Sequence, residues 1–102
     1  MLVAFSVVPS GGNNDDSFHA AVAAAVKIVR ASGLPNHTDA MFTTIEGTWD
    51  EVFAVVHQAA DAVLAYGKRV DLVLKADIRP GYSGELTGKI ERLERALSRP
   101  DT

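Results

Sequence analysis

Residues 41–52, MFTTIEGTWDEV, decide the fold that we expect, because they join a predicted strand directly to a predicted helix. Residues 41–45 are rich in β-branched and aromatic side chains, which favour strands, and Gly47 ends this run. Thr48 and Glu51 then match a capping box, in which each side chain accepts a hydrogen bond from the backbone N–H of the other residue. A helix is therefore expected to begin at Thr48.

On the N-terminal side of this corner the sequence predicts a strand, a helix and a weak edge strand. Residues 2–8 form an apolar run, typical of a central strand, that ends in a turn rich in Pro, Gly and Asn. Asp15 or Asp16 is expected to cap the helix that follows, and Gly33 to end it. The expected inner face of this helix is Phe18, Val22, Ala25, Val29 and Ser32. Residues 34–38 complete this half as an edge strand.

On the C-terminal side, the helix that begins at Thr48 is expected to run to about Tyr66. Its expected inner stripe is Val52, Val56, Ala59 and Val63. Residues 69–79 alternate apolar and polar side chains and so predict the last strand. Residues 82–98 predict a third helix, whose narrow apolar stripe is Leu86, Ile90, Leu93 and Leu97.

The element order β-α-β-β-α-β, with an added C-terminal helix, predicts an α+β fold of the ferredoxin-like class over a single domain, residues 1–102. In this sandwich two helices cover one face of a four-stranded antiparallel sheet, and the other face meets water, a partner or a ligand. The residues of the last strand that point to this open face are Asp71, Val73, Lys75, Asp77 and Arg79. A polar face interrupted by Val73 favours homo-oligomerisation through the sheet, with the C-terminal helix as extra cover.

The composition excludes several classes of function. With 102 residues, 47% of them hydrophobic and 23% charged, the chain is expected to be a soluble cytoplasmic protein. A net charge of −3 without a basic run argues against nucleic acid as a partner. The apolar N-terminal run lacks a basic region and is too short for a signal peptide or a membrane span.

The sequence also lacks the usual residues of metal and catalytic centres. The absence of cysteine rules out disulfides and thiol nucleophiles. His19, His37 and His57 are too widely spaced for a metal site, and no nucleophile elbow is present. We therefore expect no metal, no cofactor and no catalytic residue.

Three ordered blocks of the sequence resemble a known family. They are the stretch SVVP at residues 6–9, the stretch at residues 41–52, and residues 69–81, which begin with RV and end with KADIRPG. This pattern is similar to that of the small thiamine-binding protein family. The resemblance implies a ferredoxin-like fold, dimers or tetramers built through the sheets, and non-catalytic binding of thiamine or its hydroxymethylpyrimidine part.

The chemistry of thiamine selects candidate binding residues. The thiazolium cation needs a carboxylate, the aminopyrimidine needs a hydroxyl or backbone group, and both rings need an apolar or aromatic slot, for which Phe5, Phe42 and Trp49 are candidates. The predicted ligand-binding residues are Ser6, Thr43, Thr44, Glu46, Trp49, Asp50 and Asp77. Because the first strand lies between the third and fourth in this fold, Ser6, Thr44 and Asp77 are expected within reach of one another.

Each of these residues also has a structural interpretation. Trp49 can be a packing cover, Asp50 can complement the helix dipole, and Asp77 can pair with Arg79 or across a dimer. The alternative hypothesis is therefore an oligomeric regulatory or structural module that binds no thiamine. An enzyme with Asp77 or Glu46 as general base lacks a supporting constellation of residues.

Overall fold

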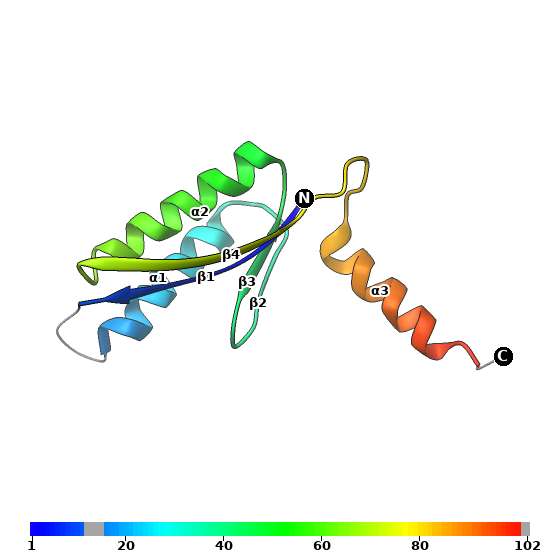
Figure 1. Cartoon of the computed structure of the whole chain (residues 1–102), viewed down its shortest axis with the longest axis horizontal. Helices are drawn as coiled ribbons and strands as arrows, with labels where there is room; N and C mark the ends of the chain where they lie inside the picture. The colour runs from blue at the N-terminus through cyan, green and yellow to red at the C-terminus, as the bar shows by residue number, and fades with distance from the viewer. Residues whose placement is uncertain (12–15, 101–102) are drawn as a thin grey trace.

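The computed structural model describes residues 1–11 and 16–100, and Figure 1 shows a sheet with two helices on one face and a third helix that projects from one end. The elements are β1 (Leu2–Ser10), α1 (Asp16–Ala31), β2 (Asn36–Thr38), β3 (Thr43–Glu46), α2 (Trp49–Leu64), β4 (Arg69–Asp77) and α3 (Glu85–Ser98). The strand order is β2-β3-β1-β4, and every neighbouring pair is antiparallel. The predicted ferredoxin-like fold is confirmed.

The two neighbours of β1 pair with it over different lengths. All of β1 pairs with β4, from Leu2 opposite Asp77 to Ser10 opposite Arg69. The β3 pairing covers only the first half of β1 and stops at Phe5 opposite Thr43. The second half of β1 therefore has a side that β3 does not reach.

Pro9 lies inside this strand, where the sequence predicted a turn. Met1 and Gly47 exchange both backbone hydrogen bonds, at 2.7 and 3.1 Å, so the odd-numbered residues of β1 direct their backbone groups toward β3. The N–H that proline lacks would point to the side that β3 leaves open, and Pro9 therefore costs the sheet no hydrogen bond. Pairing with β4 extends β1 to Ser10.

The core lies between the sheet and the two covering helices. Its fully or nearly buried residues are Val3, Phe5, Val7, Ala21, Ala25, Val29, Ile45, Val52, Val55, Val56, Ala59 and Val63. The predicted stripe of α2 is confirmed. The predicted inner face of α1 is partly wrong, because Ala21 is buried in place of Phe18, which is 44% exposed. Phe18 lies in the first turn of α1 and lines a cavity between this helix and residues 38–43, which leaves its ring exposed.

Of the predicted starts of α2 and α3, one is confirmed and the other is wrong. The capping box of α2 is confirmed, with 2.9 Å from the Thr48 nitrogen to Glu51 Oε1 and 3.3 Å from the Glu51 nitrogen to Thr48 Oγ1. The predicted start of α3 at Tyr82 is wrong, because Gly84 adopts a left-handed conformation (φ 67°) and the helix begins at Glu85. The predicted caps of α1, Asp15 and Asp16, lie outside the residues whose side chains are described.

The third helix gives the molecule its length. α3 contacts the rest of the chain through its first turns, and the long axis of the molecule measures 57 Å. The radius of gyration is 15.9 Å, against about 13 Å for a compact domain of this size. Among the described helices, none combines the length and apolar character needed to span a membrane.

Replacing Thr48 with Ala removes the hydroxyl that caps α2. We expect the free energy of unfolding to fall by about 0.5–2 kcal/mol, because the amide of Glu51 loses its acceptor. Urea unfolding followed by circular dichroism measures this change. Thr48→Ser keeps the hydroxyl and should retain most of the stability; an equal loss in both variants would contradict the capping role.

The carboxylate of Glu51 makes the stability of α2 dependent on pH. The hydrogen bond from the backbone N–H of Thr48 lowers the pKa of Glu51 below its ordinary value. Its stabilisation is therefore complete above the unfolded pKa of about 4.3 and is lost as the pH falls through the lower folded pKa. The difference in thermal midpoint between the wild type and Glu51→Gln should stay constant from neutral pH to about pH 5 and shrink below it. A difference that persists unchanged at lower pH would overturn this assignment.

Candidate functional site

The seven predicted ligand-binding residues are not gathered in one place. Thr43 is opposite Phe5 and faces the helices, whereas Thr44 points to the open face of the sheet. Ser6 is opposite Val73 and Asp77 is opposite Leu2, four residues away along β1, which is about 13 Å. The predicted meeting of Ser6, Thr44 and Asp77 is therefore wrong. The physical reason is the register: β4 runs antiparallel, so its C-terminal end lies at the start of β1.

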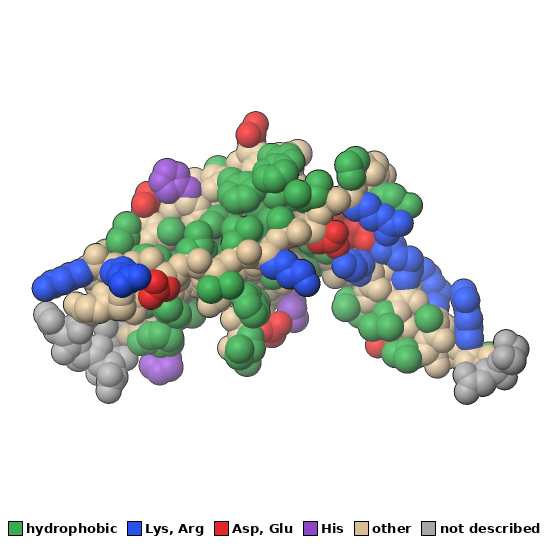
Figure 2. All heavy atoms as spheres, in the orientation of Figure 1, with side chains coloured by type: hydrophobic (Ala, Val, Ile, Leu, Met, Phe, Trp, Pro, Cys, Tyr) green, Lys and Arg blue, Asp and Glu red, His purple; other side chains and the backbone are tan. Residues whose placement is uncertain are grey.

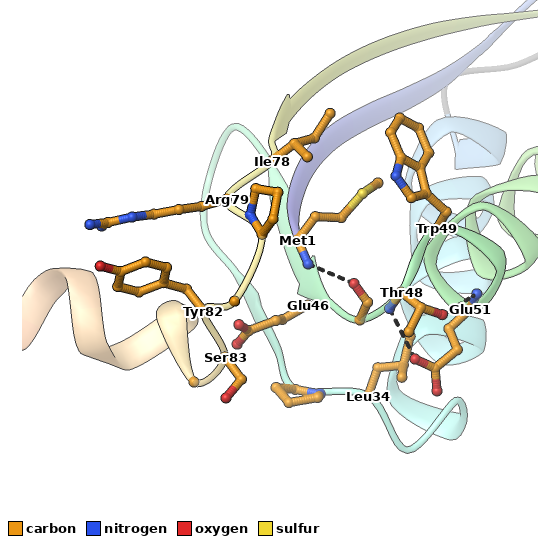
Figure 3. Close-up of a pocket in the computed structure, with 15 residues that line it drawn as sticks. Met1, Leu34, Glu46, Thr48, Trp49, Glu51, Ile78, Arg79, Tyr82 and Ser83 are labelled. Atoms are coloured by element: carbon orange, nitrogen blue, oxygen red, sulfur yellow. Dashed lines mark hydrogen bonds between the residues drawn. The ribbon is translucent and has the colours of Figure 1, made fainter.

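A first cavity lies where α3 leaves the body, and we call it the α3 cleft. Its volume is about 700 Å³, and Figure 3 shows Trp49 on one side, Arg79 and Tyr82 on the other, and Met1 and Ile78 between them. The lining residues are Met1, Leu34, Pro35, Glu46, Gly47, Thr48, Trp49, Glu51 and residues 78–84. The cleft contains two of the predicted residues, Glu46 and Trp49, whereas Asp50 lies beside it, exposed in the first turn of α2.

Glu46 is engaged with the backbone of α3. Its side chain is 7% exposed, and its two oxygens accept hydrogen bonds from the nitrogens of Glu85 and Leu86 at 2.8 and 3.1 Å. A helix start has free backbone N–H groups and a partial positive charge, so a carboxylate there is stabilising. Because Gly84, the N-cap residue, has no side chain, Glu46 of β3 supplies the cap from 39 residues away.

The other acids near the α3 cleft are engaged as well. Glu51 belongs to the capping box of α2. Asp77 lines a smaller adjoining cavity, where it accepts a hydrogen bond from Lys89 Nζ at 2.7 Å, and that bond lowers the pKa of Asp77. The guanidinium of Arg79 lies over the ring of Tyr82, 3.6 Å from its centroid. The α3 cleft thus offers aromatic surface beside a cation, which disfavours a positively charged ligand.

A second cavity lies between α1 and the turn that joins β2 to β3, and we call it the α1 groove. Its volume is about 550 Å³, and it occupies the side of β1 that β3 does not reach. The lining residues are Phe5, Ser6, Val7, Val8, Phe18, His19, Val22, Ala23, Ala25, Val26 and residues 38–43. The predicted residues Ser6 and Thr43 lie here together, with two of the predicted slot aromatics, Phe5 and Phe42.

The polar groups of the α1 groove come from the turn and the strands beside it. Thr43 is 8% exposed, and its hydroxyl lies 3.3 Å from the hydroxyl of Thr38. Asp39 accepts hydrogen bonds from the nitrogens of Met41 and Phe42 at 2.8 and 2.9 Å, both through Oδ1. These backbone bonds lower the pKa of Asp39, so its carboxylate is ionised near neutral pH. Neither bond uses Oδ2.

Asp39 is a site candidate that the sequence interpretation missed. Asp39 and Ala40 lie between the strands that the sequence predicts at residues 34–38 and 41–45, and the side chain of Asp39 closes the turn that joins them on its own backbone. The turn also carries the carboxylate to the mouth of the α1 groove, next to Phe42 and Thr43. The sequence signal for this candidate is a carboxylate between two threonines, Thr38 and Thr43.

A family model described as "Thiamine-binding protein" matches residues 3–94. The chain belongs to the thiamine-binding protein family. It is similar to the UPF0045 proteins Mb1933 of Mycobacterium bovis and MT1949 of Mycobacterium tuberculosis, each 51% identical over 102 residues, with 99% of this chain and 98% of the relative covered.

Solved structures of similar proteins share the fold. Protein MJ1052 of Methanocaldococcus jannascii is 26% identical, with a TM-score of 0.80 and coverage of 91% of this chain and 94% of that chain. A DUF77 domain from Bacillus cereus is 31% identical, with a TM-score of 0.74 and 83% of both chains covered. TM0486 of Thermotoga maritima, named for thiamine biosynthesis or salvage, is 25% identical with a TM-score of 0.73, covering 89% and 97%. The sheet and helices that frame both cavities are therefore shared with these three proteins.

Replacing Glu46 with Ala tests its role as the remote cap of α3. We expect amide hydrogen exchange at Glu85 and Leu86 to become at least about tenfold faster, since a hydrogen bond to a charged acceptor contributes about 1.5–3 kcal/mol. Exchange measured by NMR reports both amides individually. Glu91→Ala, at an exposed position of the same helix, should leave them unchanged. Unchanged exchange in Glu46→Ala would mean that the cap does not hold the helix.

Proposed function

We propose that this protein is a non-catalytic binder of thiamine, or of its hydroxymethylpyrimidine part, and that the ligand occupies the α1 groove. The observation that carries the proposal is the combination of groups in that groove: aromatic side chains, paired hydroxyls and an ionised carboxylate with one oxygen outside its backbone bonds. Membership of the thiamine-binding family supports the ligand class. TM0486, named for thiamine biosynthesis or salvage, supports the same class.

The thiazolium ring carries the permanent positive charge of thiamine. In the proposed mode it lies near Asp39, whose lowered pKa keeps the carboxylate ionised across the physiological range. Asp39 is exposed, so the attraction is screened by water and salt. The α3 cleft is less suitable for this ring, because the cation of Arg79 lies there. The carboxylates of that cleft, Glu46 and Glu51, already cap helices.

The aminopyrimidine ring needs partners for an amino group and ring nitrogens. Hydroxyls donate and accept, so the Thr38–Thr43 pair suits both kinds of atom, and Ser6 lines the groove from the adjoining strand. The ring faces would lie against Phe42 and Phe18, both of which line the groove. A volume of about 550 Å³ falls within the range of small-molecule sites, about 300–1,000 Å³.

In this proposal the protein acts as a homo-oligomer, either a dimer or a tetramer, and it sequesters or senses the ligand in the cytoplasm. Neither nucleic acid nor a membrane is a partner in this proposal. The alternative is an oligomeric regulatory or structural module without a ligand. The corner between β3 and α2 is the part of the described structure that favours it. There Glu46 and Glu51 are both explained by the helices they cap.

Isothermal titration with thiamine and with the isolated pyrimidine alcohol tests the ligand and its position. Asp39→Asn keeps the acceptor for the Met41 and Phe42 amides but removes the charge. It should weaken thiamine binding roughly two- to fivefold and leave the neutral pyrimidine alcohol unaffected. Thr43→Val removes a buried hydroxyl and leaves a side chain of similar shape. It should weaken the binding of both ligands about tenfold or more.

Trp49→Ala is the matched control, because Trp49 lines the α3 cleft and is 55% exposed. It should bind both ligands as the wild type does. If Trp49→Ala abolishes binding while Asp39→Asn and Thr43→Val retain it, the α1 groove is the wrong cavity. If the folded wild type gives no heat with thiamine, its phosphate esters or the pyrimidine alcohol, the proposed function is wrong.

A further inference from the structure

The α3 cleft has an aromatic and apolar wall that the proposed function does not use. Phe53 stacks on the ring of Trp49, with 5.4 Å between the ring centroids and 11° between the planes. Trp49 nevertheless stays 55% exposed, and Ile78, also in the cleft, is 51% exposed. Figure 3 places Met1 and Ile78 beside Trp49, and Figure 2 shows hydrophobic side chains over the start of α2. Such a wall suits a flat ring.

A tight turn over residues 79–82, with the sequence RPGY, brings a cation to the opposite side of the cleft. The Tyr82 nitrogen donates a hydrogen bond to the Arg79 carbonyl oxygen at 3.2 Å, and Gly81 has a φ of 84°. Proline at the second position and a glycine of positive φ at the third are typical of a type II turn. The turn places the Arg79 guanidinium 3.6 Å from the centroid of the Tyr82 ring.

This contact leaves the hydrogen-bonding edge of Arg79 free. A guanidinium lies on an aromatic ring through its flat face, whereas its N–H groups point outward in the plane of the group. Within residues 1–11 and 16–100, no hydrogen bond or ion pair involves the Arg79 side chain, which is exposed. A fork of N–H donors of this kind matches the paired oxygens of a carboxylate or a phosphate.

The carboxylates around the cleft already have other partners. Glu46 accepts two hydrogen bonds from the backbone of α3, and Glu51 belongs to the capping box of α2. In the adjoining smaller cavity, Asp77 and Glu85 are each paired with a basic side chain of α3. Arg79 is therefore the charged side chain of the described cleft lining that has neither a hydrogen-bond nor an ion-pair partner. An anion from a ligand can provide that partner.

We propose that the α3 cleft is a separate binding site for a small molecule that combines an aromatic ring with a carboxylate or phosphate group. The ring lies against Trp49 and Ile78, and the anionic group accepts hydrogen bonds from the edge of Arg79. The cleft volume of about 700 Å³ falls within the range of small-molecule sites, about 300–1,000 Å³.

This inference goes beyond the proposed function, because the ligand charge and the place in the fold both differ. Thiamine carries a cationic ring, whereas the α3 cleft selects an anion. The cleft lies at the start of β1, where Met1 lines it, and the α1 groove lies along Phe5–Val8 of the same strand. The two sites share no lining residue, so each can be tested and can fail without the other.

The fluorescence of Trp49 tests the site directly, because the chain has one tryptophan. Titration with phenyl phosphate and with benzoate should change its emission saturably, in the millimolar range expected for ligands of this size. Benzyl alcohol, which has the ring without the charge, should bind at least about tenfold more weakly than the better anion. That anion also identifies the preferred group, phosphate or carboxylate. No saturable change with either anion, or equal binding of benzyl alcohol, would overturn the proposal.

Substitutions of Arg79 test what recognises the anion. Arg79→Gln should weaken phenyl phosphate binding at least about tenfold, and Arg79→Lys, which keeps the charge but lacks the planar edge, should give an intermediate loss. Arg95→Gln is the matched control, because Arg95 is exposed on α3 and does not line the cleft. It should bind phenyl phosphate as the wild type does. Unchanged binding by Arg79→Gln, with the thermal midpoint of the wild type, would overturn the proposal.

Isothermal titration of two variants separates this inference from the proposed function. Trp49→Ala should lose phenyl phosphate binding and keep thiamine binding, whereas Thr43→Val should show the reverse. A wild type that binds thiamine but neither anion would remove the α3 cleft site alone, and one that binds phenyl phosphate but no thiamine would remove the proposed function alone. Phenyl phosphate binding that Thr43→Val abolishes and Trp49→Ala retains would move the anion to the α1 groove and overturn the inference.

Discussion

The two hydrogen bonds that the Glu46 carboxylate accepts from the start of α3 determine the outline of this molecule. They attach the third helix at the end of β3 and direct its axis away from the sheet. The same bonds bury Glu46 on the side of the sheet that is otherwise uncovered. The α3 cleft and the exposed stripe of Ile90, Leu93 and Leu97 follow from that attachment, and Figure 2 shows hydrophobic side chains on the side of α3 that faces the β2–β3 hairpin.

Hydrogen bonding distinguishes the two cavities more clearly than volume does. In the α3 cleft the carboxylates of Glu46 and Glu51 already serve helix starts, and the cation of Arg79 faces an aromatic ring. In the α1 groove Asp39 closes its turn through one oxygen and leaves the other outside those bonds. A carboxylate whose bonds stabilise the fold is expensive to redirect to a ligand, whereas a spare acceptor at a cavity mouth is available without cost to the fold. This contrast supports the α1 groove as the ligand site.

Unequal strand pairing connects the fold to the proposed functions. Because β3 stops at Phe5 of β1 while β4 continues to Ser10, one flank of β1 is left free, and the α1 groove occupies it. Pro9 is accommodated on the same flank, where its missing N–H has no strand to meet. The helices α1 and α2 pack on one face of the sheet, whereas Ile90, Leu93 and Leu97 of α3 stay exposed. The solved structures of similar proteins show that the sheet and helices are shared.

The sequence by itself determined the element order, the sheet class and the capping box of α2, because alternation, helical spacing and cap chemistry act over a few residues. It also determined the apolar stripe of α3 and the family to which the chain belongs. Only the tertiary structure decided which candidates lie together. Register placed Asp77 at the start of β1, four residues from Ser6 in the middle of that strand. The chain reversal at Asp39 brought that carboxylate beside Thr43, and Glu46 caps a helix 39 residues away. Contacts between residues so distant in the chain depend on packing and strand register, which leave no local pattern in the sequence.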